Sequence, residues 1–83
     1  MELHISNLCD KITENDLKDL FAKHGTVLGS KIFVDPYTRQ RKDYGLVTMS
    51  TREDGLKALK KINGKEVNDR LLIVKERDSF IIE

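Results

Sequence analysis

The sequence predicts a single α+β domain in which two helices cover one face of a four-stranded antiparallel sheet. Its length of 83 residues is that of one small domain. Four segments show the alternation of apolar and polar residues that is typical of strands, and two show the spacing of amphipathic helices. They follow one another as strand, helix, strand, strand, helix and strand, so the chain consists of two similar halves.

The first strand is indicated by alternation, and the first helix by its capping residues. Apolar residues alternate with histidine and serine over residues 3–6, which predicts a half-buried strand. Thr13 and Asp16 have the spacing of a capping box, and Leu17 opens an apolar stripe, so we expect a helix to begin here. The sequence Lys-His-Gly at residues 23–25 supplies a cationic last turn and a glycine stop.

The middle of the chain predicts two strands joined by a turn. Residues 27–34 alternate as a second strand, and Asp35 with Pro36 indicates the turn that follows. Residues 39–42 are Arg-Gln-Arg-Lys, which predicts a basic loop that leads into the third strand. That strand is expected to end near residue 50.

A second helix and a fourth strand complete the pattern. Thr51 and Asp54 repeat the capping spacing of the first helix, and Asn63 with Gly64 indicates where the second helix ends. Residues 71–75 alternate again and are expected to form the fourth strand.

The whole order corresponds to the ferredoxin-like β-α-β-β-α-β plan. We expect the domain to span residues 1–77 and to be followed by an apolar tail at residues 78–83. Because both helices cover the same face of the sheet in this plan, the other face is open.

The composition limits the class of protein only broadly. The chain is 39% hydrophobic and 35% charged, as is ordinary for a soluble protein. Its net charge is only +1, so a nucleic-acid partner would have to be bound by locally placed charges. No apolar run is long enough to cross a membrane. The sequence has no charged-then-apolar leader, and we therefore expect a cytoplasmic protein.

Two short motifs indicate what the open face does. Residues 42–49, Lys-Asp-Tyr-Gly-Leu-Val-Thr-Met, resemble the octamer of the RNA recognition motif family. The matching positions are Lys42, Tyr44, Gly45 and Val47, whereas Asp43, Leu46 and Met49 depart from the family pattern. Residues 3–8, Leu-His-Ile-Ser-Asn-Leu, resemble the hexamer of the same family, with His4 at its aromatic position. The resemblance covers nearly the whole chain, which is similar to single-domain RNA-binding proteins.

The resemblance implies that the open face binds single-stranded RNA, and single-stranded DNA as well unless a contact selects the 2′-hydroxyl group. The candidate residues on this face and in the basic loop are His4, Ser6, Lys31, Phe33, Arg39, Arg41, Lys42, Tyr44, Leu46 and Lys75. Tyr44 is expected to stack a base with support from His4, and Lys42 to contact phosphate. Leu46 replaces an aromatic residue of the family and can only pack against a sugar or a base edge.

Each of these features also has a plainer interpretation. A lysine on a strand is often just a solvated charge, and an aromatic ring often reflects strand propensity. For Phe33 and His4 both interpretations stay open.

An apolar patch on the same face leads to a second hypothesis. Leu46, Leu71, Ile73 and Phe33 would be exposed together, and such patches often lie at protein interfaces. In this hypothesis the face binds a protein partner or a second copy in a homodimer, or the tail at residues 78–83 covers it.

The sequence contains no arrangement that is typical of an enzyme. His4 and His24 are expected far apart, and no motif places a serine, cysteine or carboxylate beside either of them. A glycine-rich phosphate loop is missing, and the lone Cys9 cannot form a disulfide or a paired-cysteine metal loop. We therefore expect a non-catalytic protein without a cofactor or metal.

Overall fold

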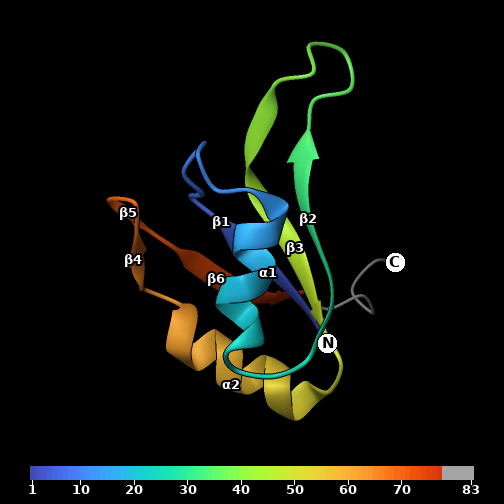
Figure 1. Cartoon of the computed structure of the whole chain (residues 1–83), viewed down its shortest axis with the longest axis vertical. Coiled ribbons are helices and arrows are strands. Elements are labelled where there is room, and N and C mark those ends of the chain that lie inside the picture. Colours follow the sequence, from blue (N-terminus) through green and yellow to red (C-terminus); the bar gives the residue numbers. More distant parts are fainter. Residues whose placement is uncertain (78–83) are drawn as a thin grey trace.

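The computed structural model describes residues 1–77, and the main elements follow the predicted order (Figure 1). The elements are β1 (Glu2–Ser6), α1 (Glu14–Ala22), β2 (Val27–Val34), β3 (Arg41–Met49), α2 (Arg52–Ile62), β4 (Glu66–Val67), β5 (Arg70–Leu71) and β6 (Ile73–Arg77). Four strands form one antiparallel sheet in the order β2-β3-β1-β6, so β3 and β1 are its central strands. The apolar tail predicted at residues 78–83 lies outside the described residues.

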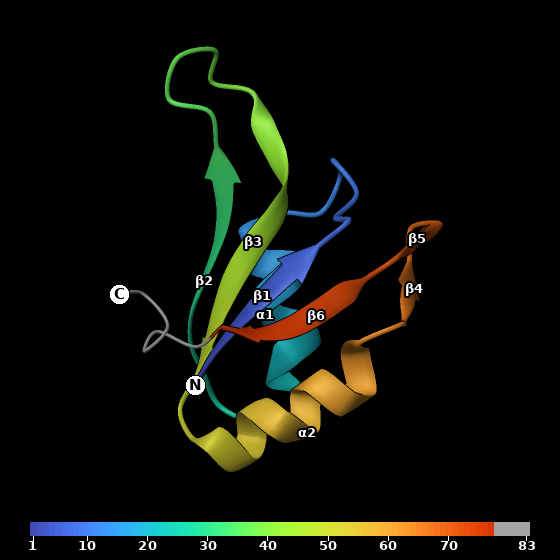
Figure 2. The same ribbon diagram turned by 180° about the vertical axis from the view of Figure 1, so that it is seen from behind.

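Both helices pack on one face of the sheet. In Figure 1, α1 lies in front of the strands with α2 below it, and the opposite view in Figure 2 shows the strands in front of α1. This arrangement confirms the predicted ferredoxin-like fold, and within residues 1–77 it leaves one face of the sheet open.

Both helices begin at the threonines that the sequence indicated as caps. The hydroxyl of Thr13 accepts a hydrogen bond from the N–H of Asp16 at 3.0 Å, and the Asp16 carboxylate accepts one from the N–H of Thr13 at 3.1 Å. The predicted capping box is therefore confirmed. Thr51 accepts from the N–H of Asp54 at 3.1 Å, and the Asp54 carboxylate accepts from the N–H of Thr26 at 3.4 Å, which links α2 to the start of β2. Within residues 1–77, no helix is long and apolar enough to span a membrane.

The core lies between the helices and the sheet and follows the predicted alternation. The buried side chains from strands and helices are Leu3, Ile5, Leu17, Phe21, Ile32, Val47, Met49, Ala58, Ile62 and Val74. Fully burying one large apolar side chain contributes roughly 1.5–3 kcal/mol, so these residues determine which face of each strand turns inward. The residues between them in each strand consequently face the open side.

Gly45 allows β2 and β3 to approach each other closely. A Cβ atom at this position would collide with the main-chain carbonyl oxygen of Lys31 and would lie 3.4 Å from the Cα atom of Ile32. Main-chain atoms cannot turn aside as a flexible side chain can. The close approach of the two strands therefore explains the glycine at this position of the octamer. Gly45 keeps the side chains of β2 and β3 close together on the open face.

The prediction for the fourth strand was wrong in its limits. The strand is Ile73–Arg77 rather than residues 71–75, because β4 and β5 form a separate small hairpin before it. The two turn residues of this hairpin, Asn68 and Asp69, have φ angles of 52° and 65°. Two-residue hairpin turns of type I′ require positive φ at both positions, and asparagine and aspartate tolerate it. Leu71 consequently lies in the hairpin and not in the four-stranded sheet.

Candidate nucleic-acid interface

Three rings lie side by side on the open face, one from each of three neighbouring strands. Tyr44 on β3 lies between His4 on β1 and Phe33 on β2, and we call these three residues the ring row. The ring centroids of Tyr44 and His4 are 5.6 Å apart with an angle of 28° between the planes. Those of Tyr44 and Phe33 are 5.3 Å apart with an angle of 41°. All three residues are half-buried, so each ring is supported by its neighbours and still accessible.

A line of paired residues crosses all four strands and shares His4 with the ring row. The register of the sheet pairs Lys31 with Leu46, Leu46 with His4, and His4 with Lys75. Residues directly opposite each other in antiparallel strands lie on the same face. The line therefore has a cation at each end, on β2 and on β6. The Nζ atom of Lys31 also lies 5.3 Å from the centroid of the Phe33 ring.

Ser6 lies on the same face near the end of β1, opposite Ile73 of β6. The next residue, Asn7, has a φ of 63°, which ends the strand. Its side-chain amide donates to the carbonyl of Leu71 at 2.9 Å and accepts from the guanidinium of Arg70 at 3.0 Å. These bonds fix the hairpin of β4 and β5 beside the candidate face.

Lys42 is exposed on β3, but its ammonium group has a partner. Its Nζ atom lies 3.7 Å from the carboxylate of Asp35. The same carboxylate accepts hydrogen bonds from the backbone N–H groups of Tyr37 at 2.8 Å and Thr38 at 3.3 Å. These backbone bonds, with Lys42 as a smaller contribution, hold the pKa of Asp35 below its ordinary value. A phosphate group would therefore compete with Asp35 for Lys42.

Arg41 does not lie in a basic loop, as the sequence suggested, but is the first residue of β3. It is half-buried, and its guanidinium donates to the carbonyls of Cys9 at 2.9 Å and Asp10 at 3.0 Å. These bonds attach the loop between β1 and α1 to β3. The expectation of a loop is therefore wrong for Arg41, whereas Lys42 belongs to the strand, as its place in the octamer predicted.

The loop between β2 and β3 presents Arg39 and an aromatic residue that was not predicted. The N–H of Asp35 donates to the carbonyl of Gln40, and the N–H of Arg39 donates to the carbonyl of Asp35, both at 2.8 Å. Tyr37 in this loop is 93% exposed, and Arg39 is exposed as well. Figures 1 and 2 show the loop projecting from the rest of the molecule. The only sequence signal for Tyr37 is an aromatic residue directly after the proline of a turn.

The face therefore offers flat rings and cations to a ligand. Within the described part of the chain, no group of three or more His, Cys, Asp or Glu residues could hold a metal ion. A ferredoxin-like sheet that carries rings on its open face is the arrangement found in domains that stack the bases of single-stranded RNA. The fold and the three rings of this chain are thus typical of that class of domain.

Comparison with known proteins identifies the family. Residues 3–73 match the model of the RNA recognition motif family, and the chain belongs to it. It is 40% identical over 65 residues to glycine-rich RNA-binding protein 1 of Sorghum bicolor, which covers 78% of this chain and 46% of that protein. It is 32% identical over 74 residues to scaffold attachment factor B2 of Homo sapiens, which covers 89% of this chain and 8% of that protein. The chain thus spans less than half the length of these curated relatives.

Solved structures agree with the fold. The crystal structure of RNA Binding Protein PG1 matches with a TM-score of 0.86 and 29% identity, over 95% of this chain and 99% of that chain. The Rna15 RRM with bound RNA (GU) matches with a TM-score of 0.83 over 98% of this chain and 86% of that chain. At 23% identity, the second likeness concerns the fold alone.

Proposed function

We propose that this chain binds single-stranded RNA on the open face of its sheet by base stacking and phosphate contacts, without catalysing a reaction. The ring row is the observation that carries the proposal, since Tyr44 has a second ring within 5.6 Å on either side. Successive unpaired bases can stack on such a platform because every base has a flat face. The relative from Sorghum bicolor, which is named as an RNA-binding protein, supports the same assignment.

Each of the three rings is proposed to contact a different base of a short RNA segment. Tyr44 stacks the central base, while His4 and Phe33 support its neighbours on β1 and β2. Each stacked base is worth about 1–3 kcal/mol of binding free energy. Leu46 contributes an apolar contact with a sugar or a base edge.

Phosphate groups are expected at the cations that border the rings. Lys31 and Lys75 are exposed at the two ends of the line of paired residues, and Lys42 adds a third cation once phosphate replaces Asp35. Ser6 and Arg39 are expected to add polar contacts at the margins. Each phosphate contact with a single strand contributes about 0.7 to the slope of log affinity against log salt, so binding should weaken as salt rises. Single-stranded DNA should bind by the same contacts unless a 2′-hydroxyl contact discriminates against it.

Fluorescence anisotropy of labelled random-sequence single-stranded RNA tests the proposal with the whole chain at low and moderate salt. Tyr44→Ala should weaken binding by about 1–3 kcal/mol, whereas Tyr44→Phe should bind nearly as well as the wild type because the ring is retained. Circular dichroism would confirm that both variants are folded. Equal affinities of the wild type and a folded Tyr44→Ala variant would rule out the ring row as the binding platform.

A protein interface on the same face is the second hypothesis, and one exposed side chain supports it. Ile73 on β6 is 43% exposed beside the ring row, although Leu46 and Phe33 are half-buried. The patch is therefore smaller than the sequence predicted, also because Leu71 lies outside the sheet. Analytical ultracentrifugation of the wild type and Ile73→Ser would support this hypothesis if an oligomer dissociates in the variant. A monomeric wild type would argue against self-association.

A further inference from the structure

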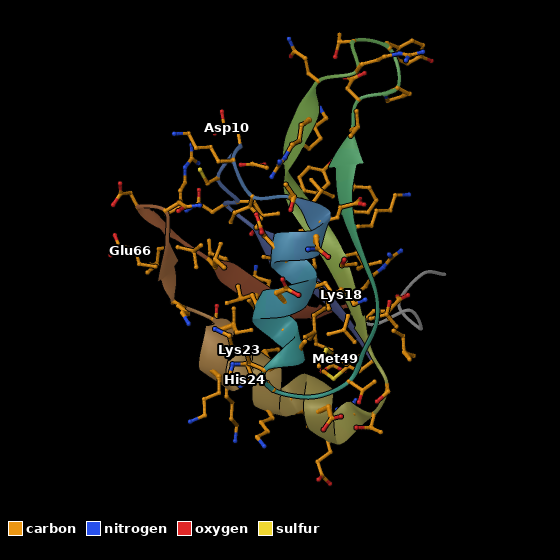
Figure 3. All side chains as sticks on the ribbon, viewed as in Figure 1. Asp10, Lys18, Lys23, His24, Met49 and Glu66 are labelled. Carbon is orange, nitrogen blue, oxygen red and sulfur yellow. The ribbon has the colours of Figure 1, made fainter. Side chains whose placement is uncertain are left out.

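A group of lysines lies on the helix side of the molecule, away from the ring row. We define the lysine cluster as Lys23 at the end of α1, Lys57 and Lys61 on α2, and Lys65 shortly after α2. All four residues are exposed. Lys57 and Lys61 are one helical turn apart and therefore share a face of α2. Figure 3 shows Lys23 and His24 together beside α2.

No lysine of the cluster forms an ion pair within the described part of the chain. Residues 55–65 contain three lysines of the cluster together with Lys60 and no carboxylate, although the whole chain has a net charge of only +1. Burial lowers the pKa of His24, and the ammonium groups of all four lysines lower it further. The cations therefore act together at one place, and a bound anion would relieve their repulsion.

The helix dipoles explain only part of the lysine cluster. Lys23 follows α1, and Lys61 lies in the last turn of α2, where a cation contributes roughly 0.3–1 kcal/mol to stability. Lys57 lies one turn earlier, and Lys65 lies beyond the end of the helix. The interaction of cations with a helix dipole therefore does not account for Lys57 and Lys65.

The chemistry of the lysine cluster favours phosphate groups over a protein surface. Protein interfaces are enriched in aromatic residues, methionine and arginine, and they are depleted in lysine. A lysine ammonium is a compact charge on a flexible stem, which suits contacts with phosphates that do not depend on the base sequence. The molecule measures 19 Å along its shortest axis, so an RNA strand that leaves the sheet has a short path to the helices.

We propose that the lysine cluster binds the phosphate backbone of RNA that extends beyond the segment held on the sheet. The inference rests on the proposed function, because it adds a second contact for the same RNA. The sheet holds a few nucleotides by stacking, and the lysine cluster holds the continuing strand by charge. The chain therefore binds long RNA more tightly than short RNA, without further selection of sequence.

Affinities for two RNA lengths test the proposal. An RNA of about six nucleotides occupies the sheet alone, whereas one of about 25 nucleotides extends well past it. The double variant Lys57→Gln/Lys61→Gln should reduce the salt slope for the longer RNA by about 1.4 and its affinity by up to about 25-fold near 0.1 M salt. Its affinity for the short RNA should stay at the wild-type value. The variant Lys57→Arg/Lys61→Arg keeps the charge and should bind both RNAs as the wild type does.

The double variant Lys11→Gln/Lys18→Gln is the matched control. Both lysines are exposed, both lie outside the lysine cluster, and the same amount of charge is removed. If the two glutamine variants lose the same affinity for the longer RNA, the effect depends on net charge alone and the proposal is overturned. Tyr44→Ala separates the two claims, because it should weaken binding of both RNA lengths. If Tyr44→Ala has no effect on either length, the proposed function fails, while the lysine cluster is still judged by the difference between the glutamine variants.

An NMR titration of the two histidines gives an independent readout. Binding of the long RNA should raise the pKa of His24, because phosphate offsets the nearby ammonium groups. The short RNA should shift the resonances of His4 on the sheet and leave the pKa of His24 unchanged. An unchanged pKa of His24 with the long RNA bound would overturn the proposal. Polyglutamate that binds with the same dependence on Lys57 and Lys61 would assign the lysine cluster to acidic proteins and would overturn it as well.

Discussion

The open face of the sheet and the helix side of the molecule both present lysines, but in different surroundings. On the sheet, Lys31 and Lys75 lie at the ends of a line of paired residues and border three rings. On the helix side, the lysine cluster lies close enough to His24 for its ammonium groups to lower the pKa of the imidazole. The comparison shows that the neighbours of a lysine determine what it can recognise. Beside rings it can orient a nucleotide, whereas among other lysines it acts by charge alone, as in the proposed contact with phosphates.

The largest effect is expected from Gly45→Ala, which should damage the sheet face and leave the helix side in place. The new methyl group would collide with the carbonyl of Lys31 and push β2 away from β3, which separates Phe33 from Tyr44. Such overpacking costs about 1–3 kcal/mol of the free energy of unfolding, as denaturant titration would measure. Gly29→Ala is the control in the same sheet, because nothing lies within 4 Å of a Cβ atom there. If both variants lost a similar, small amount of the free energy of unfolding, the steric role of Gly45 would be contradicted.

Arg41→Ala should reduce stability more than it reduces RNA affinity. The variant loses two hydrogen bonds to the carbonyls of Cys9 and Asp10, which should cost about 1–2 kcal/mol given the partial exposure of the side chain. Lys42→Ala should show the opposite pattern, with little change in stability and weaker RNA binding. Denaturant titration and anisotropy measure the two quantities. A fully stable Arg41→Ala variant that binds RNA weakly would restore Arg41 as an RNA contact.

Asp35→Asn should strengthen RNA binding slightly by releasing Lys42. The asparagine side chain can still accept the hydrogen bonds that Asp35 receives in the turn, so the loop should keep its shape. A partly exposed ion pair is worth up to about 1 kcal/mol, and the gain in affinity should lie within that range. Asp43→Asn removes the same charge beside Lys42 in the sequence. An equal gain in RNA affinity for Asp43→Asn would show that the ion pair between Asp35 and Lys42 does not compete with RNA.

The smallest effect concerns the dependence of stability on pH at the helix side. The pKa of His24 is lowered in the folded chain, so the unfolded chain takes up this proton first as the pH falls. The free energy of unfolding should therefore decrease as the pH falls from above 6.5, the ordinary value, to the lower folded pKa. His24→Gln should lack this part of the pH dependence, and Lys57→Gln/Lys61→Gln should weaken it. An unchanged pH dependence in His24→Gln would assign it to other groups.

The sequence by itself determined the order of the main elements and the faces of the strands, but not the hairpin of β4 and β5. Alternation placed Leu3 and Val47 in the core and His4 and Tyr44 on the open face, because the side chains of a strand alternate whatever its partner is. The capping box of Thr13 was equally predictable, since its two hydrogen bonds span only three residues.

Contacts between distant segments were decided by the tertiary structure alone. Phe33 lies beside Tyr44 because of the register of β2 against β3, which shifts between Ile32 and Val34. Arg41 bonds to carbonyls about thirty residues earlier in the chain, so its spacing in the sequence could not reveal its role. The lysine cluster likewise combines Lys23, which follows α1, with lysines on and just after α2. The physical reason is that alternation and capping are local properties, whereas register and packing depend on which segments meet.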